Sequence, residues 1–244
     1  MYLPVPCNNK PVRTRFRYAI LFLLISCMMI HAGYTQVVTE STRKKISVGV
    51  SEFTDIWSGE PNHVWTRTIN QGFSVLGTYN VPFGKSGISF ALGLGMTWHN
   101  MYGNFYVNSG NSFTTVKDIP DTVFWKRSKL RVGYFEVPIE FRYRDKSKFN
   151  FALGFKGGFL LDSGTKYIGD GTLNTVNYTV NRQGKTTIKM NHIKNMNQFT
   201  YGPTMRIGYS WITASFSWMI TSIFENNKGP DISSFSIGFM LMPF

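Results

Sequence analysis

Charged residues are scarce in this chain of 244 residues, where they make up 16% of the total. A soluble domain usually has roughly a quarter of its residues charged. Acidic residues are the scarcer kind, since 13 Asp and Glu against 26 Lys and Arg leave a formal net charge of +13. Hydrophobic residues reach 43% and aromatic residues 16%, and this apolar content excludes an intrinsically disordered chain.

Cysteine is also scarce, because Cys7 and Cys27 are the only two. A disulfide-rich scaffold is therefore excluded. Long apolar runs are missing as well. The longest covers residues 19–30, whereas a transmembrane helix needs about 20 apolar residues. The sequence thus excludes a bundle of transmembrane helices.

The N-terminal region has the layout of a secretory signal peptide. Its apolar core, residues 19–30, is followed by the small residue Ala32. Four basic residues and no acid precede that core: Lys10, Arg13, Arg15 and Arg17. We predict a signal peptide over residues 1–32, which takes both cysteines with it, and a short periplasmic segment over residues 33–44. Two alternatives stay open: an uncleaved anchor, and a lipoprotein signal, since Leu24–Cys27 loosely resembles a lipobox.

From residue 45 onward apolar and polar residues alternate, which is typical of strands with two different faces. In residues 88–98 the even positions are Ile, Phe, Leu, Leu, Met and Trp, and the odd positions are small or polar. The same pattern predicts eight strands, each near the roughly 9–11 residues that cross a membrane. They cover residues 46–53, 71–81, 88–98, 131–143, 149–161, 197–207, 212–221 and 233–242.

The connections alternate in length, with short turns after every second strand. The long connections lie near residues 54–70, 102–128, 163–196 and 222–232. Tight periplasmic turns and longer external loops are typical of outer-membrane barrels. We therefore predict an all-β fold over residues 45–244, an eight-stranded antiparallel up-and-down transmembrane β-barrel of the outer-membrane type. The third long connection could carry a ribbon built from residues 177–180 and 186–189.

A soluble β-sandwich is the alternative fold, and the aromatic residues weigh against it. Two interfacial girdles are expected near the strand ends. One comprises Trp98, Tyr102, Phe105 and Trp125, and the other comprises Tyr79, Phe83, Tyr143, Tyr209 and Trp211. The opposite strand faces are rich in Gly, Ser and Thr, which suits a narrow lumen better than a solvent surface.

Charged residues on those polar faces predict a network inside the barrel. Its members are Glu136, Glu140, Arg142, Lys156 and Arg206. If Arg144 pairs with Lys148 across the turn, Glu136 lies directly opposite Lys156. Because small barrels are filled by side chains, we expect these charges to fix the register, with a proton or ion pathway as the alternative.

The chain ends on Phe244, and we expect this terminal aromatic residue to be the signal that the barrel assembly machinery reads. Phe244 differs in parity from the apolar positions of the last strand, and Pro243 lies between. The end of the chain is therefore expected to bulge or to leave the sheet.

Catalytic chemistry has little support in the sequence. His63, His99 and His192 lie in or beside the long connections, with no paired acids or serine motif around them. Their spacing fits no metal-ligand template. We predict no catalytic residue, cofactor site or metal site. A rim-located hydrolase or lipid-modifying enzyme, with His99 as its best candidate, stays as the alternative to a non-enzymatic barrel, as does a small structural barrel without a transport role.

Basic residues gather in or beside the second and third long connections. They are Lys117, Lys126, Arg127, Lys129, Lys166, Arg182, Lys185, Lys189 and Lys194. At the surface of an outer membrane such residues suit the anionic headgroups of lipopolysaccharide. Nucleic acid is not an expected partner in that compartment.

The run Tyr134–Tyr143 (YFEVPIEFRY) resembles the most recognisable strand of the PorT-like outer-membrane β-barrels of Bacteroidota. The following strand, Phe149–Asp162, is similar to that family in its Gly and Phe content. The likeness covers roughly residues 45–244. The resemblance implies an integral, multi-pass outer-membrane protein. It also implies a role in type IX secretion, because the namesake of the family is required for that export of proteins. Secretion-system proteins are then the expected partners.

Overall fold

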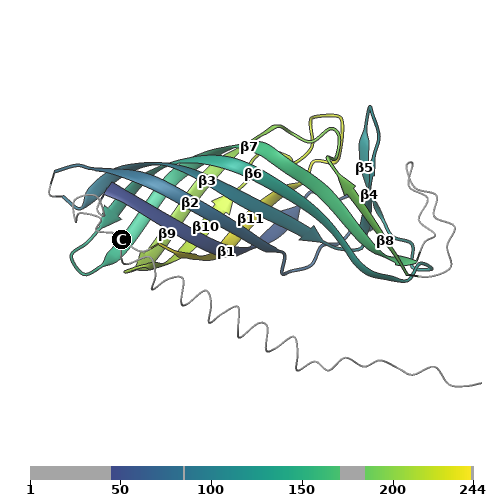
Figure 1. Ribbon diagram of the computed structural model, residues 1–244, viewed down its shortest axis with the longest axis horizontal. Helices are drawn as coiled ribbons and strands as arrows, with labels where there is room; N and C mark the ends of the chain where they lie inside the picture. Colours follow the sequence, from purple (N-terminus) through teal and green to yellow (C-terminus); the bar gives the residue numbers. More distant parts are fainter. Residues whose placement is uncertain (1–44, 85, 171–184, 243–244) are drawn as a thin grey trace, which may run out of the picture. The chain divides into compact units, whose positions relative to one another are not determined.

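Eight strands form one closed antiparallel barrel in the computed structural model, which describes residues 45–84, 86–170 and 185–242 (Figure 1). The eight are β1 (Ile46–Ser58), β2 (Gln71–Pro82), β3 (Ile88–Tyr102), β6 (Trp125–Arg144), β7 (Phe149–Asp170), β9 (Phe199–Tyr209), β10 (Ile212–Trp218) and β11 (Ser233–Leu241). Each barrel strand pairs with the next along the chain, and β1 closes the ring by pairing with β11. The predicted fold class is confirmed. No helix in the described residues is long and apolar enough to cross a membrane.

The wall follows from the alternation in the sequence. In β1 the odd positions from Ser47 to Trp57 are buried and the even positions face outward. Glycine relieves crowding on the inner face, since a Cβ on Gly93 would lie 2.7 Å from Cγ2 of Thr78. A side chain at that position would therefore push the neighbouring strands apart.

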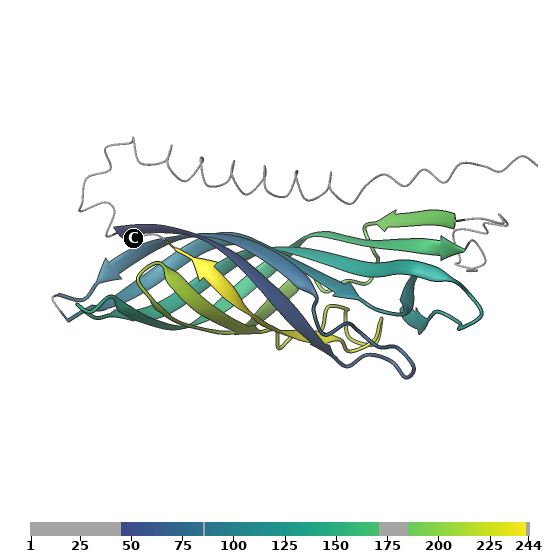
Figure 2. The same ribbon diagram turned by 90° about the horizontal axis from the view of Figure 1, so that it is seen from below.

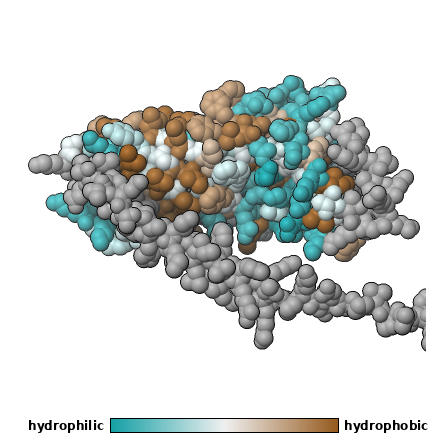
Figure 3. Space-filling view, in the orientation of Figure 1, coloured by the Kyte–Doolittle hydropathy of each residue, from teal (hydrophilic) through white to brown (hydrophobic). Residues whose placement is uncertain are grey.

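The outward faces carry an apolar belt around the barrel. From β1 to β11 it includes Val48, Val50, Phe73, Val75, Leu92, Leu94, Ile139, Phe141, Leu153, Phe155, Met205, Ile207, Ile212, Trp218, Ile237 and Phe239, all exposed. Aromatic rings pair across strands in it, with Phe73 and Trp98 stacked at a centroid distance of 6.3 Å. Figure 3 shows apolar residues over the half of the barrel near the short turns and hydrophilic residues over the other half.

Short turns join strands at one end of the barrel, here called the short-turn end. In the turn between β6 and β7, the Ser147 hydroxyl donates to Asp145 at 2.6 Å. That bond, with the backbone N–H groups of Lys146 and Ser147, holds the pKa of Asp145 below its usual value. The opposite end, with the longer connections, is called the long-loop end.

Strands continue into the connections at the long-loop end, which differs from the sequence prediction. β1 runs to Ser58 and β7 to Asp170, well beyond the predicted strand ends at 53 and 161. A separate hairpin, β4 (Phe105–Ser109) with β5 (Thr114–Asp118), occupies the second long connection. β8 (Lys185–Asn191) pairs with the extension of β7 and includes the predicted ribbon arm 186–189 (Figure 2). The other arm, 177–180, lies outside the described residues.

An apolar plug fills the lumen at the long-loop end. Its buried members are Trp57, Met101, Phe105, Val107, Val116, Leu130, Val132, Tyr134, Ile193, Met196, Met219, Ile223, Phe224 and Ile232. The β4–β5 hairpin is tied to neighbouring segments, since Thr114 donates its N–H to the Lys228 carbonyl and its hydroxyl to the Lys194 carbonyl, both at 2.8 Å. The expected girdle was wrong for Phe105. That residue is fully buried because the hairpin folds it inward.

Candidate functional site

The lumen below the plug holds the charged residues that the sequence placed there. Lys156 Nζ donates to Oε1 of Glu136 at 2.8 Å, and the Thr97 hydroxyl donates to Oε2 of Glu136 at 2.7 Å. These side chains come from β7, β6 and β3, so one carboxylate ties three neighbouring strands together. Glu136 is buried, and Lys156 is nearly so.

The predicted register of this pair was wrong by two residues. Glu136 lies opposite Gly158, and Lys156 lies opposite Pro138. The cause is the turn, because Arg144 pairs with Asn150 and not with Lys148. A shift of two leaves every side chain on the same face of the sheet. The two side chains therefore still meet, along a diagonal between the strands.

A second carboxylate, Glu140, joins two arginines. Arg142 donates to its Oε2 from Nε at 2.9 Å and from Nη2 at 2.8 Å. Arg206 Nη2, from β9, donates to the same oxygen. Arg142 also donates to Oδ1 of Asn80 at 2.6 Å, which extends the cluster to β2. The structure thus brings all five predicted charges into two neighbouring groups, which we call the lumen charge network.

All members of this network are largely removed from solvent. Because water cannot solvate them, their charges are stabilised by pairing with one another. Two glutamates face two arginines and one lysine, which leaves one excess positive charge. Below it a cavity of about 310 Å³ opens toward the short turns and is lined by Asn80, Asn150, Arg142, Arg144 and Arg206, among others. The lumen is therefore polar and hollow at one end and apolar and filled at the other.

A third buried polar cluster was missed by the sequence reasoning. His99 Nδ1 lies 3.0 and 3.1 Å from the two carboxylate oxygens of Asp55, and the Ser236 hydroxyl donates to the same carboxylate at 2.6 Å. All three residues are buried. The His99 ring packs against Phe53 and Tyr134, at centroid distances of 5.2 and 6.0 Å.

His99 is therefore a buried residue of the barrel interior and not an exposed residue of the rim, and the acid that it contacts, Asp55, is 44 residues away in the sequence. Asp55 fell in a predicted loop because β1 was ended at residue 53, five residues too early. The parity of β1 would have shown it, since Asp55 shares the inner face with Phe53 and Trp57. His63 and His192, by contrast, are exposed, and both have positive φ values.

The order of contacts in this cluster differs from that of a serine hydrolase. A catalytic triad places the serine against one nitrogen of the histidine and the carboxylate against the other. Here Ser236 and His99 both contact Asp55, and Nε2 of His99 is buried with no hydrogen-bond partner among the described residues. The cluster instead links three strands, because Asp55 on β1 is hydrogen-bonded to His99 on β3 and to Ser236 on β11. In the described part of the chain no group of three or more His, Cys, Asp or Glu could hold a metal ion.

One carboxylate faces the opposite way. Glu52 has the outward parity of Val50 and Ile56, and it lies opposite Phe73 on β2 and Phe239 on β11. It is exposed, and no described side chain donates a hydrogen bond to it. Glu52 is thus a charged group set within the apolar belt. The even-numbered position of Glu52, shared with Val48 and Val50, could have shown from the sequence that it faces outward.

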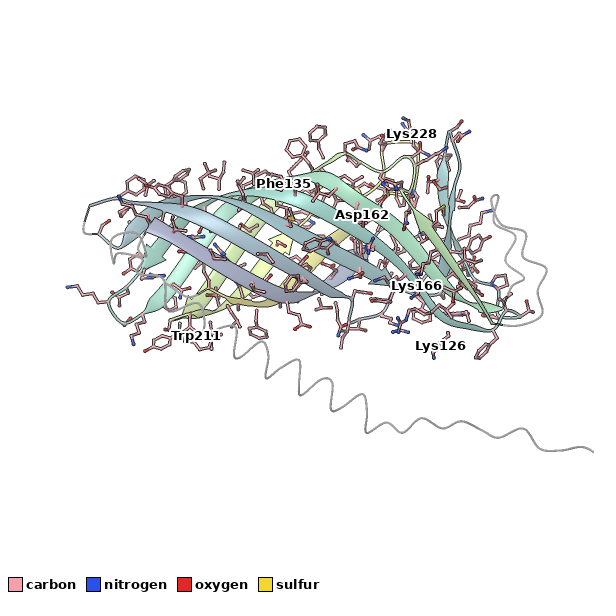
Figure 4. The ribbon with its side chains drawn as sticks, viewed as in Figure 1. Lys126, Phe135, Asp162, Lys166, Trp211 and Lys228 are labelled. Carbon is pink, nitrogen blue, oxygen red and sulfur yellow. The ribbon has the colours of Figure 1, made fainter. Side chains whose placement is uncertain are left out.

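The basic residues of the long connections divide into two groups. One group lies on β6, β7 and β8 and comprises Lys126, Arg127, Lys129, Lys166 and Lys189. The other lies around the β4–β5 hairpin and comprises Lys117, Lys194 and Lys228 (Figure 4 labels Lys126, Lys166 and Lys228). Arg182 and the side chain of Lys185 lie outside the described residues, as does the predicted assembly signal Phe244. The predicted signal peptide and periplasmic segment lie outside them too.

A closed antiparallel barrel with an outward apolar belt and a polar lumen defines the class of β-barrels that span a membrane. Residues 43–225 match the family described as outer membrane protein beta-barrel domain, and the chain belongs to that family. A comparison with curated proteins found no match. The family and the closed barrel together indicate the outer membrane as the location of the protein.

Proposed function

We propose that this protein is a non-enzymatic outer-membrane barrel that acts through a protein partner in the membrane, as an accessory component of type IX protein secretion. The run Tyr134–Tyr143, which resembles the PorT-like family, supports the assignment to that system. In the fold this run supplies Glu136, Glu140 and Arg142 to the lumen charge network. Its distinctive residues are therefore accounted for by barrel structure, and the link to secretion rests on the resemblance.

Glu52 is the observation that carries the partner hypothesis. A carboxylate facing lipid loses its hydration, and ionisable groups within a membrane usually face a protein interior or pair with another group. Along the outward face of β1, Glu52 has Val50 on one side and Thr54 on the other, with Ile56 beyond it, and aromatic residues lie opposite Glu52 on both neighbouring strands. A hydrogen-bond donor from a neighbouring membrane protein would offset this cost. The wall formed by β11, β1 and β2 is thus the proposed contact surface.

The filled lumen favours this hypothesis over transport. Eight-stranded barrels have interiors just wide enough to be filled by side chains. Here the apolar plug occupies the long-loop end, and the lumen charge network lies below it. We therefore assign the barrel no conducting role of its own. Barrel assembly machinery that reads Phe244, and lipopolysaccharide contacted by the basic residues, complete the proposed set of partners.

The test is a deletion strain complemented with the wild-type gene or with Glu52→Leu. Deletion should abolish type IX secretion and leave lipid A structure unchanged. Glu52→Leu should assemble into the membrane at the wild-type level and secrete less. Thr54→Leu is the matched control, because residue 54 lies on the same face of β1 two positions away. Normal secretion in the deletion strain would contradict the proposal, and altered lipid A with normal secretion would favour the enzyme alternative.

A further inference from the structure

Three lysines form a row across the strands that extend beyond the belt. Lys129 on β6 lies directly opposite Lys166 on β7, and Lys166 lies directly opposite Lys189 on β8. We call this row the lysine ladder. Tyr102 on β3 continues it, because Tyr102 lies directly opposite Lys129.

The lysine ladder faces outward. The alternate residues of β6, Ser128 and Leu130, are buried, whereas Lys129 is partly exposed and Lys189 is exposed. Lys129 has the same parity as Ile139 and Phe141 of the belt, with regular pairing to β3 between them. The ladder is therefore the continuation of the lipid-facing surface toward the long-loop end.

Like charges directly opposite one another destabilise a sheet, so the ladder has an energetic cost. No described acid lies within ion-pair distance of any of its three lysines. Asp162, on β7 like Lys166, is bound to Arg131. Lys129 Nζ donates instead to Oδ1 of Asn100 at 2.8 Å. A bound anion would supply the missing negative charge.

A hollow beside the ladder adds two arginines. It has a volume of about 640 Å³, and Arg67, Arg127 and Tyr102 contribute to its lining. The Tyr102 ring lies 5.6 Å from the Arg67 guanidinium carbon and 5.5 Å from Lys129 Nζ, so both cations converge on it. Two arginines thus line the hollow, and Lys129 of the ladder adjoins it over the Tyr102 ring.

The height of this surface fits a lipid headgroup. Tyr102 lies four residues beyond Trp98, which stacks on Phe73 in the belt. Four residues span about 13 Å along a strand, or about 9 Å of height when the strand is tilted by roughly 45°. The interfacial layer of a bilayer is roughly 5–8 Å deep on each side. The ladder therefore begins at the outer edge of the headgroup layer when Trp98 lies at the edge of the hydrocarbon, and it rises from Lys129 toward Lys189 because the strands are tilted.

We propose that the lysine ladder, with Arg67 and Arg127, binds the phosphate groups of a phosphorylated glycolipid in the outer leaflet. The acyl chains of that lipid would lie on the belt below, against Trp98 and Phe73. This inference rests on the lipopolysaccharide partner of the proposed function and names the site and the chemical group it recognises.

The experiment compares purified full-length variants for binding to vesicles that contain bisphosphorylated lipid A. Changing all three ladder lysines to Gln should weaken binding about 100-fold, since each basic residue near an anionic surface contributes roughly a factor of five. Lys117, Lys146 and Lys228 changed together to Gln form the matched control. All three lysines are exposed and lie outside the ladder. Their replacement lowers the net charge by the same amount as the ladder variant does, so this control should bind nearly as the wild type does.

The proposal would be overturned if the ladder variant and the control lost the same amount of vesicle binding, since net charge alone would then explain the loss. Equal binding to dephosphorylated lipid A, or displacement of the lipid by an equimolar amount of inorganic phosphate, would overturn it as well. Heat-modifiable migration in gels checks folding, and the single Gln variants replace the triple variant if that one does not fold. Secretion is a separate readout: a ladder variant that loses lipid and still supports secretion leaves the secretion proposal intact.

Discussion

Lys156 bonds to Glu136 along a diagonal, with its ammonium 2.8 Å from the carboxylate although the backbone places Lys156 opposite Pro138. The long lysine side chain spans the two-residue offset. The carboxylate is held from a third strand by Thr97. The bond thus fixes the relative position of β3, β6 and β7 at the middle of the barrel.

Removing one partner of this buried pair should destabilise the barrel. We predict that Glu136→Ala lowers the free energy of unfolding by about 3–5 kcal/mol, because Lys156 is then left as an uncompensated charge. The measurement is the urea midpoint of the barrel in detergent or lipid. The double variant with Glu136→Leu and Lys156→Met should recover most of the loss. An unchanged midpoint in Glu136→Ala would contradict the pairing.

Glu140 should matter more than Glu136, since two arginines share its carboxylate. Glu140→Gln removes the charge and leaves the guanidinium groups of Arg142 and Arg206 facing each other. We predict a loss greater than that of Glu136→Gln in the same urea assay. If the two variants unfold at the same midpoint, Glu140 does not connect the two arginines in the way the structure shows.

The Asp55 cluster gives a prediction about stability and about chemistry. Asp55→Ala leaves the His99 ring and the Ser236 hydroxyl without their shared acceptor, at a cost of about 1–3 kcal/mol for each unsatisfied group. His99→Ala and Ser236→Ala should each cost less than Asp55→Ala. Lipid A structure should be unchanged in all three variants. A change in lipid A caused by His99→Ala at normal barrel levels would support the enzyme alternative.

Glu52 should be unfavourable for the isolated barrel. We predict that Glu52→Leu raises the free energy of unfolding in lipid by about 1 kcal/mol, since acidic residues facing lipid destabilise barrels, though less than the 2–4 kcal/mol of Arg or Lys. Thr54→Leu serves as the control for added apolar surface. A lower stability of Glu52→Leu than of the wild type would indicate that the carboxylate has a structural partner within the barrel.

The alternation of residues was enough to predict the barrel, because each strand buries one face and exposes the other. The same parity placed Glu136, Glu140, Arg142, Lys156 and Arg206 in the lumen, where the structure brings them together. It could equally have identified Glu52 as a charge on the belt. These inferences need only the side of the strand on which a residue lies.

The sequence could not predict contacts that depend on where a strand ends or on which distant strands pair. Asp55 meets His99 because β1 runs past residue 53, and Ser236 joins them because β11 closes the barrel on β1. The offset of Lys156 from Glu136 depends on two extra residues in a turn. Alternation alone carries neither the length of a strand nor the size of a turn.

The most direct test of the partner hypothesis is photo-crosslinking from position 73 in living cells. Phe73 lies directly opposite Glu52 on the outward face of β2, so a photoreactive residue there leaves Glu52 in place. The control position is Leu153, an exposed belt residue on β7. We predict a crosslinked protein from position 73, lost in Glu52→Leu, and none from position 153. Crosslinks to lipid alone at both positions would contradict the account.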